Sequence, residues 1–242
     1  MRAAEKSMGL ASIFMVLGDM DINSALQNNG TPWYHGVIKT GGGPMELLTR
    51  DFYDRDTVTV ARELLGKHLV RVTDTGELLV GRITETEAYV GRMDKACHAY
   101  GYKRTGRTET LFAPPGTAYI YLIYGMYHCL NFVTEPEGEP CAVLIRGVKA
   151  VENGDIIAKN RFGRKMEEMT PYQRKNFLNG PGKVCKGLSL TREQNGVDLT
   201  RRESGLYACG GPAPAQVQVG KRIGIDYAQE AVDFPWRFWT EK

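Results

Sequence analysis

Two stretches of this chain carry most of the information about its fold. Residues 83–89 read Ile-Thr-Glu-Thr-Glu-Ala-Tyr, and residues 115–131 read Pro-Gly-Thr-Ala-Tyr-Ile-Tyr-Leu-Ile-Tyr-Gly-Met-Tyr-His-Cys-Leu-Asn. Both stretches alternate in the way that is typical of β-strands. The alternation of the second stretch breaks at Tyr124-Gly125-Met126, so we expect residues 118–133 to form a β-hairpin that turns there.

The residues on either side of these stretches predict further strands with helices beside them. Asp56 is a favourable cap for a helix with one apolar stripe, and Gly66 is a favourable stop for it. Thr170-Pro171 predicts the start of a helix that ends near Asn179-Gly180, and Pro181 opens another short helix. Strands are expected at 68–72, 78–90 and 141–148, with strand composition again at 217–239.

These elements do not alternate as strand, helix, strand along the chain. We therefore predict an α+β fold, a single domain in which helices flank a mainly antiparallel, curved β-sheet and a β-hairpin protrudes. Residues 91–116 show no sustained period and are expected to form a long loop, which in a compact domain is usually functional.

Alternate residues of a strand share a face, so the pattern groups several polar and aromatic side chains. Three rows are expected: Glu85 with Glu87 and Tyr89, Tyr119 with Tyr121 and Ile123, and Tyr127 with Cys129 and Asn131. If these strands pair, a carboxylate, several aromatic rings and an amide line one pocket. Such a pocket suits a planar base, and the hairpin turn exposes Tyr124 as a wedge for a base stack.

Composition and charge narrow the class of protein. The chain has 242 residues and a formal net charge of +3, but residues 149–192 hold ten Lys or Arg against four Asp or Glu. A basic face on a nearly neutral protein fits a polyanion, although a solvated helical surface explains the same charges. Five cysteines without a CxxC pair indicate a reducing, cytoplasmic protein, and no apolar run reaches the ~20 residues of a membrane span.

The motifs together resemble the alkyladenine (3-methyladenine) DNA glycosylase family, in a bacterial form. The resemblance rests on Gly-Arg-Ile-Thr-Glu-Thr-Glu-Ala-Tyr at 81–89, His98, Pro-Gly-Thr-Ala-Tyr-Ile-Tyr at 115–121, Tyr-Gly-Met-Tyr at 124–127, Asn131, Val-Leu-Ile-Arg at 143–146 and Gly-Pro-Gly-Lys-Val-Cys at 180–185. These motifs occur in order over about residues 45–239. The resemblance implies a monofunctional enzyme that flips alkylated or deaminated purines out of duplex DNA and hydrolyses their N-glycosidic bond.

The resemblance also assigns roles to residues of this chain. It implies that Glu87 is the general base that activates water, that Arg146 supports Glu87, and that Tyr124 intercalates into the duplex. The base pocket would consist of Tyr89, His98, Tyr121, Asn131 and Leu144, with Tyr119 and Tyr127 supporting it from behind and Arg107 and Lys183 contacting phosphates. No cofactor and no metal are expected.

Other interpretations fit the residues less well. Cys97-His98 and His128-Cys129 suggest zinc, but neighbours on a strand point to opposite faces, so each pair offers one ligand. A lysine nucleophile would make the enzyme a lyase as well, but no lysine lies in the expected pocket segments. A non-catalytic nucleic-acid-binding module of the same fold would have less use for the Glu87 carboxylate. A hydrolase of free nucleosides would have less use for the Tyr124 wedge.

The remaining expectations concern organisation and partners. Residues 1–44 are polar after a short apolar run and end in Gly-Gly-Gly-Pro, so we predict a dispensable N-terminal extension before the glycosylase domain at 45–242. The expected partner is duplex DNA with damaged purines, with no membrane association. The protein is expected to act as a monomer in the cytoplasm, at the nucleoid of a bacterium.

Overall fold

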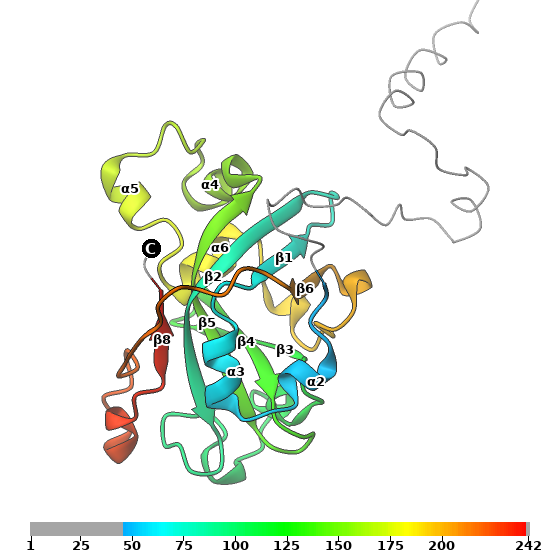
Figure 1. Cartoon of the computed structure of the whole chain (residues 1–242), viewed down its shortest axis with the longest axis vertical. Helices are drawn as coiled ribbons and strands as arrows, with labels where there is room; N and C mark the ends of the chain where they lie inside the picture. Colours follow the sequence, from blue (N-terminus) through cyan, green and yellow to red (C-terminus); the bar gives the residue numbers. More distant parts are fainter. Residues whose placement is uncertain (1–45, 241–242) are drawn as a thin grey trace, which may run out of the picture. The chain divides into compact units, whose positions relative to one another are not determined.

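The structure, a computed structural model, describes residues 46–240, so the predicted extension at 1–44 lies outside the described residues. Its centre is a sheet with the strand order β3-β4-β5-β2-β1-β6 (Figure 1). Strand β8 pairs with β2, and β7 pairs with β8. The strands are β1 (His68–Val72), β2 (Leu78–Val90), β3 (Ala118–Ile123), β4 (Tyr127–Thr134), β5 (Cys141–Glu152), β6 (Leu206–Cys209), β7 (Gln218–Gly220) and β8 (Arg237–Trp239).

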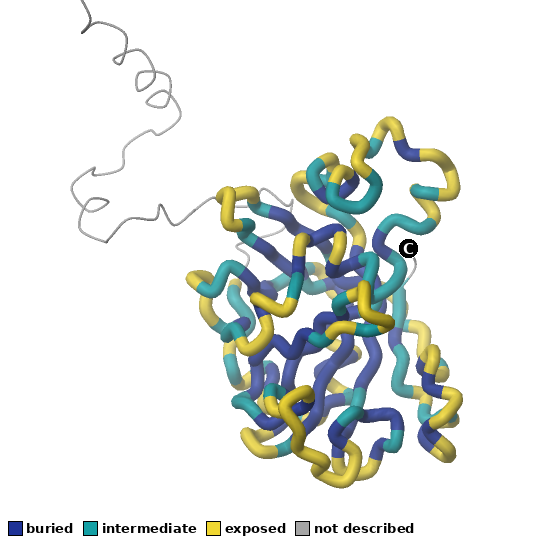
Figure 2. The backbone as a smooth tube through the Cα atoms, turned by 180° about the vertical axis from the view of Figure 1, so that it is seen from behind, coloured by how far each residue is buried: buried dark blue, intermediate teal, exposed yellow. Residues whose placement is uncertain are grey.

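Every pairing between these named strands is antiparallel, which confirms the predicted α+β class. The helices are α2 (Arg50–Tyr53), α3 (Thr57–Glu63), α4 (Gly154–Phe162), α5 (Pro171–Lys175) and α6 (Pro181–Gly187). Helix α3 contacts β2 and β5, whereas α6 contacts β4 and β5. Most residues of the sheet are buried (Figure 2), as expected for a sheet that is covered by helices and loops.

Helix α3 shows why the local sequence predictions succeed. The Asp56 side chain accepts a hydrogen bond from the Thr59 backbone N–H and so caps the helix. Its apolar stripe joins the largest buried cluster, and Gly66, with φ of +86°, ends the turn that follows. On the sheet side, the Thr86 hydroxyl donates to the Ala61 carbonyl at 2.7 Å, which ties α3 to the middle of β2.

Strand β2 is the longest strand and the scaffold of the molecule. It pairs with β5 along most of its length, with β1 through its first residues, and with β8 at residues 85–87. Register shifts interrupt the β2–β5 ladder near Val80 and Glu85, which is how β-bulges re-aim side chains. Residues 85–87 therefore lie between β5 and β8, two strands that come from distant parts of the chain.

Strands β3 and β4 form the predicted hairpin, with Tyr119 opposite Asn131 and Tyr121 opposite Cys129. The turn lies at the predicted residues, and Tyr124 there has a φ of +53° and is 81% exposed. A non-glycine residue in this left-handed region is uncommon, so the turn holds this tyrosine outward at some conformational cost.

The structure corrects three boundaries in the C-terminal half. Strand β5 ends at Glu152 rather than at the predicted Val148. The helix that Thr170 caps ends at Lys175 rather than near Asn179-Gly180. Residues 217–239 are strand only at β7 and β8, and turns with a short 3-10 helix (Gln229–Asp233) separate them. The apolar composition of this tail instead serves a small buried cluster around Ala228 and Ala231 that packs against Tyr89 of β2.

Candidate active site

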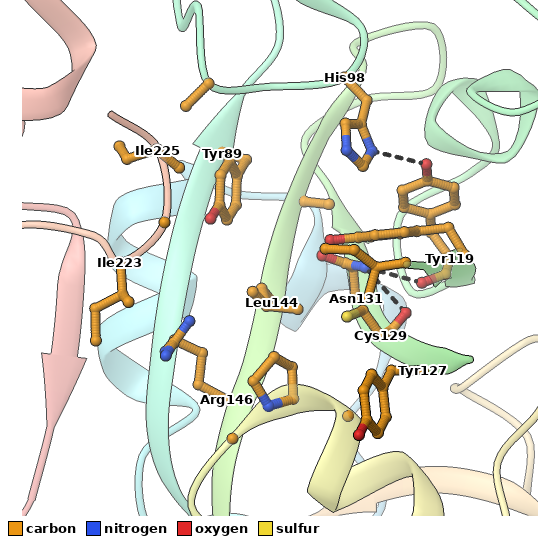
Figure 3. A pocket seen from close by; sticks show the side chains of 18 of the residues that line it. Tyr89, His98, Tyr119, Tyr127, Cys129, Asn131, Leu144, Arg146, Ile223 and Ile225 are labelled. Carbon is orange, nitrogen blue, oxygen red and sulfur yellow. Dashed lines mark hydrogen bonds between the residues drawn. The ribbon is translucent and has the colours of Figure 1, made fainter. Parts of the chain in front are cut away.

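A pocket of about 620 Å³ opens where β2, β3, β4 and β5 meet the 91–116 loop, the start of α6 and residues 223–227. The side chains that line it come from strands and loops far apart in the sequence (Figure 3). Of the residues predicted for the site, it is lined by Tyr89, His98, Tyr119, Tyr121, Tyr124, Tyr127, Asn131, Leu144, Arg146 and Lys183. The structure thus brings together most of the residues that the motifs singled out.

Glu87 lies directly behind the wall of this pocket and is fully buried. The Tyr89 hydroxyl donates to its Oε2 at 2.7 Å, and the Ile223 backbone N–H donates to its Oε1 at 2.8 Å. Arg146 Nη1 lies 3.5 Å from the same Oε1. Because all three of these partners line the pocket, the carboxylate is one side-chain layer away from a ligand.

Burial sets the protonation behaviour of this carboxylate. Loss of solvent raises the pKa of Glu87, and this effect outweighs Arg146 and the two hydrogen bonds, which lower it. A carboxylate with a raised pKa is a stronger base than an exposed one and works closer to neutral pH. The same site raises the pKa of the Tyr89 phenol, through burial and through the adjacent Glu87, so the phenol keeps its proton and remains a donor.

Arg146 is held between two carboxylates. Its Nε donates to Glu85 Oε1 at 3.1 Å, while its Nη1 faces Glu87. Glu85 also lies 3.3 Å from Arg237 Nη1 of β8, so one buried carboxylate connects two arginines from different strands. The strand alternation predicted that Glu85 shares a face with Glu87, but it did not predict the contact of Glu85 with Arg146.

Aromatic rings surround the opposite side of the pocket. His98 and Tyr121 meet edge to face with centroids 4.6 Å apart, and His98 Nδ1 lies 3.1 Å from the Tyr119 hydroxyl. Figure 3 shows Tyr89 on one side of the cavity and His98 with Tyr119 on the other. Burial, together with the nearby Arg107, lowers the pKa of His98 to about 4, so the imidazole is neutral at ordinary pH.

Asn131 and Leu144 are paired across β4 and β5 and line the same pocket. The Asn131 amide nitrogen donates to the carbonyls of Tyr119, at 3.1 Å, and Cys129, at 3.4 Å. An amide group has two N–H donors, and both are used by the backbone. Asn131 is therefore held rigidly and offers a ligand its bulk and its carbonyl oxygen.

The rim of the pocket contains the hairpin tip and the start of α6. Tyr127, 43% exposed, packs against Gly182, where an added Cβ would lie 2.9 Å from the Tyr127 Cβ. This glycine therefore permits the close approach of α6 to the hairpin. Next to it, Lys183 Nζ donates to the side-chain oxygens of Asn176 and Asn179.

The structure adds detail on two basic residues of the site. No lysine lies in the strand segments of the motifs, but Lys183 lines the pocket from α6, a segment distant from them. Arg107, predicted to contact phosphate, has its Cζ 5.1 Å from the Tyr121 ring centroid and its Nη2 3.4 Å from His98 Nε2. The structure therefore places its guanidinium over the aromatic side of the pocket.

Residues 223–225 close the pocket beside Glu87, and the sequence motifs did not predict this. Ile223, Gly224 and Ile225 line the pocket, and the buried Arg222 beneath them pairs with Asp94. No local pattern marks these residues, because they lie in an irregular segment more than 120 positions from either partner. Only the tertiary fold reveals their contact with the site.

Among residues 46–240, no group of three or more His, Cys, Asp or Glu side chains is placed to hold a metal ion. The helices within this described range are too short or too polar to cross a bilayer. The five cysteines are all buried and unpaired with one another.

A buried carboxylate behind an aromatic pocket, beside an exposed tyrosine at a hairpin tip, indicates an enzyme that acts on a planar base in a nucleic acid. Comparison with known proteins agrees with this class. The methylpurine-DNA glycosylase family matches residues 51–242 of the chain.

Curated relatives extend the comparison to nearly whole proteins. Proteins from Clostridium perfringens, Alkaliphilus oremlandii and Clostridium novyi, named as 3-methyladenine DNA glycosylases, are 50%, 48% and 46% identical to this chain. The matches cover 80–81% of this chain and 95–96% of the relatives. The chain belongs to the methylpurine-DNA glycosylase family and is a DNA glycosylase, a hydrolase of N-glycosyl bonds, as the motifs predicted.

Proposed function

We propose that this protein is a monofunctional glycosylase that removes alkylated or deaminated purines from duplex DNA and leaves an abasic site. The substrate class comprises 3-methyladenine, 7-methylguanine, hypoxanthine and ethenoadenine. The observation that carries the proposal is the buried Glu87 carboxylate, held by Tyr89, Ile223 and Arg146 directly behind an aromatic pocket.

In the proposed reaction, Glu87 accepts a proton from a water molecule that enters between the rings and Arg146. The water oxygen bonds to the anomeric carbon, the N-glycosidic bond breaks, and its electron pair leaves with the purine. The raised pKa of Glu87 makes it a competent proton acceptor, and Arg146, 3.5 Å away, offsets part of the negative charge. A positioned general base of this kind contributes about 10²–10⁴-fold to the rate.

Tyr89 and Tyr121 would stack on the purine, and His98 would close its edge as a neutral imidazole. Stacking contributes roughly 1–3 kcal/mol per base and depends little on the base, which suits an enzyme with several damaged substrates. The bulk of the rigidly held Asn131 would crowd the exocyclic amino group of guanine and so disfavour the normal base. Leu144 completes the apolar floor.

A purine inside a duplex must leave the base stack to reach this pocket, at a cost of a few kcal/mol. Tyr124, exposed at the tip of the hairpin, is placed to occupy the gap that the flipped base leaves. Lys183, beside it on the rim, and Arg107 would contact phosphates, and the basic residues between 149 and 192 would attract the DNA backbone.

The surroundings of Lys183 favour simple hydrolysis over a lyase reaction. A Schiff base requires a lysine amine as the nucleophile, whereas Lys183 Nζ is held by hydrogen bonds to the side-chain oxygens of Asn176 and Asn179. Strand cleavage by the pure protein without added base would contradict this part of the proposal. We further propose that the enzyme acts as a monomer in the cytoplasm.

The test is single-turnover excision from duplex oligonucleotides that contain hypoxanthine or ethenoadenine, comparing wild type with Glu87→Gln. We expect alkali-labile abasic sites from the wild type and a loss of at least about 10²-fold in the variant. Equal rates would remove Glu87 from its role. Tight DNA binding without excision of these bases or of methylated purines would refute the proposed substrate class.

A further inference from the structure

Arg222 and Asp94 form an ion pair whose side chains are completely buried. Arg222 donates through both terminal nitrogens to both Asp94 oxygens, with Nη2 to Oδ1 at 2.8 Å. The same guanidinium donates to the carbonyls of Ala88, at 2.8 Å, and Ala231, at 3.1 Å. Four hydrogen bonds thus fix one side chain to β2, to the 91–116 loop and to the C-terminal segment.

A pair buried this deeply is poor evidence for a stabilising role. Removing two charges from water costs about as much as their attraction returns, so an apolar pair of similar volume often folds as well. The fixed geometry of a bidentate arginine does, however, hold neighbouring groups in place. The Arg222–Asp94 pair is therefore better explained by the neighbouring groups that it holds in place.

The groups next to Arg222 are those that hold the catalytic carboxylate. The residue that follows it, Ile223, donates its backbone N–H to Glu87 Oε1. The guanidinium Cζ also lies 4.7 Å from the ring centroid of Tyr89, whose hydroxyl donates to Glu87 Oε2. Both hydrogen bonds to the carboxylate therefore come from groups that Arg222 contacts directly or carries on the next residue.

We infer that Arg222, clamped by Asp94, is a positioning residue that sets the orientation of the Glu87 carboxylate through Ile223 and Tyr89. The inference rests on the proposed role of Glu87 as general base. Residues 223–225, which directly follow Arg222, belong to the wall of the pocket, so the C-terminal tail completes the active site in addition to covering β2.

The test is a double-mutant cycle in single-turnover excision of ethenoadenine from duplex DNA, with Arg222→Met, Glu87→Gln and the combined variant. We expect Arg222→Met to lose about 10²-fold in rate, because a small misplacement of a catalytic group has an effect of that size. In the Glu87→Gln background the same change should cost less than about threefold, because a residue that acts through Glu87 has little left to affect.

Two matched variants separate positioning from general damage. Lys221→Met removes an exposed ion pair, Lys221 with Asp233, from the adjacent position of the same segment, and its rate should remain that of the wild type. Arg222→Lys keeps the charge but not the fork, so it should recover only part of the loss. If Arg222→Met does not fold, as judged by thermal denaturation, Arg222→Lys takes its place in the cycle.

Equal losses in both backgrounds, or a folded Arg222→Met with the wild-type rate, would overturn the inference. A failure of the proposed function would look different, because the wild type would then excise no base, and a failure of the role of Glu87 would leave Glu87→Gln with the wild-type rate.

Discussion

Truncation of Tyr124 tests whether the hairpin tip drives base flipping. The side chain is 81% exposed, so Tyr124→Ala should change the free energy of unfolding by no more than about 0.5 kcal/mol. Alanine, like tyrosine, has a β-carbon, so the conformational strain of the φ of +53° is the same in the variant and in the wild type. If the ring replaces the flipped base in the stack, its removal costs roughly 1–3 kcal/mol of stacking. Since 1.4 kcal/mol corresponds to a tenfold change, excision should slow by about 5- to 150-fold.

The assay compares hypoxanthine paired in a duplex with hypoxanthine in a bulge that has no opposing base. The loss in Tyr124→Ala should appear with the paired base and largely disappear with the bulged one, where little stacking must be replaced. Tyr124→Phe keeps the ring and should retain the wild-type rate on both substrates. Equal losses on the two substrates, or an unchanged rate on the paired one, would refute the wedge.

Three further predictions follow from the electrostatics of the site. The excision rate of the wild type should fall at acid pH with a midpoint above ~4.3, the ordinary pKa of Glu, because burial raises the pKa of Glu87. A midpoint below that value in a single-turnover pH series would contradict this. Near neutral pH, the Glu87→Gln variant should have the same Tm as the wild type or a higher one. The pKa of Glu87 is higher in the folded than in the unfolded state, so its ionised form destabilises the fold, and glutamine cannot ionise. This difference should vanish as pH falls through the unfolded pKa, as scanning calorimetry at several pH values would show. The pKa of His98 is lowered to about 4, mainly by burial and secondly by Arg107, so Arg107→Ala should raise it. If the pKa of His98 measured by NMR titration does not change, Arg107 does not lie over the pocket.

The cap, the hairpin and strands β1 and β2 could be predicted because each depends on residues that are close together in the chain, whereas β6 was not predicted. The Asp56 cap and the turn at Tyr124 follow from local backbone preferences, which hold in most folds. The end of the helix at Lys175 and the short strands of the tail were mispredicted, because tertiary packing decides such boundaries.

The sequence by itself determined that a carboxylate and several tyrosines share strand faces, since a period of two residues places Glu87 beside Tyr89. Only the tertiary structure decided what surrounds that carboxylate. Arg146 comes from the paired strand β5, Lys183 from α6, and Ile223 from a tail that closes over β2. Contacts of this kind are set by which distant strands pair and how loops cover the sheet, and a single buried arginine such as Arg222 leaves no periodic signal in the chain.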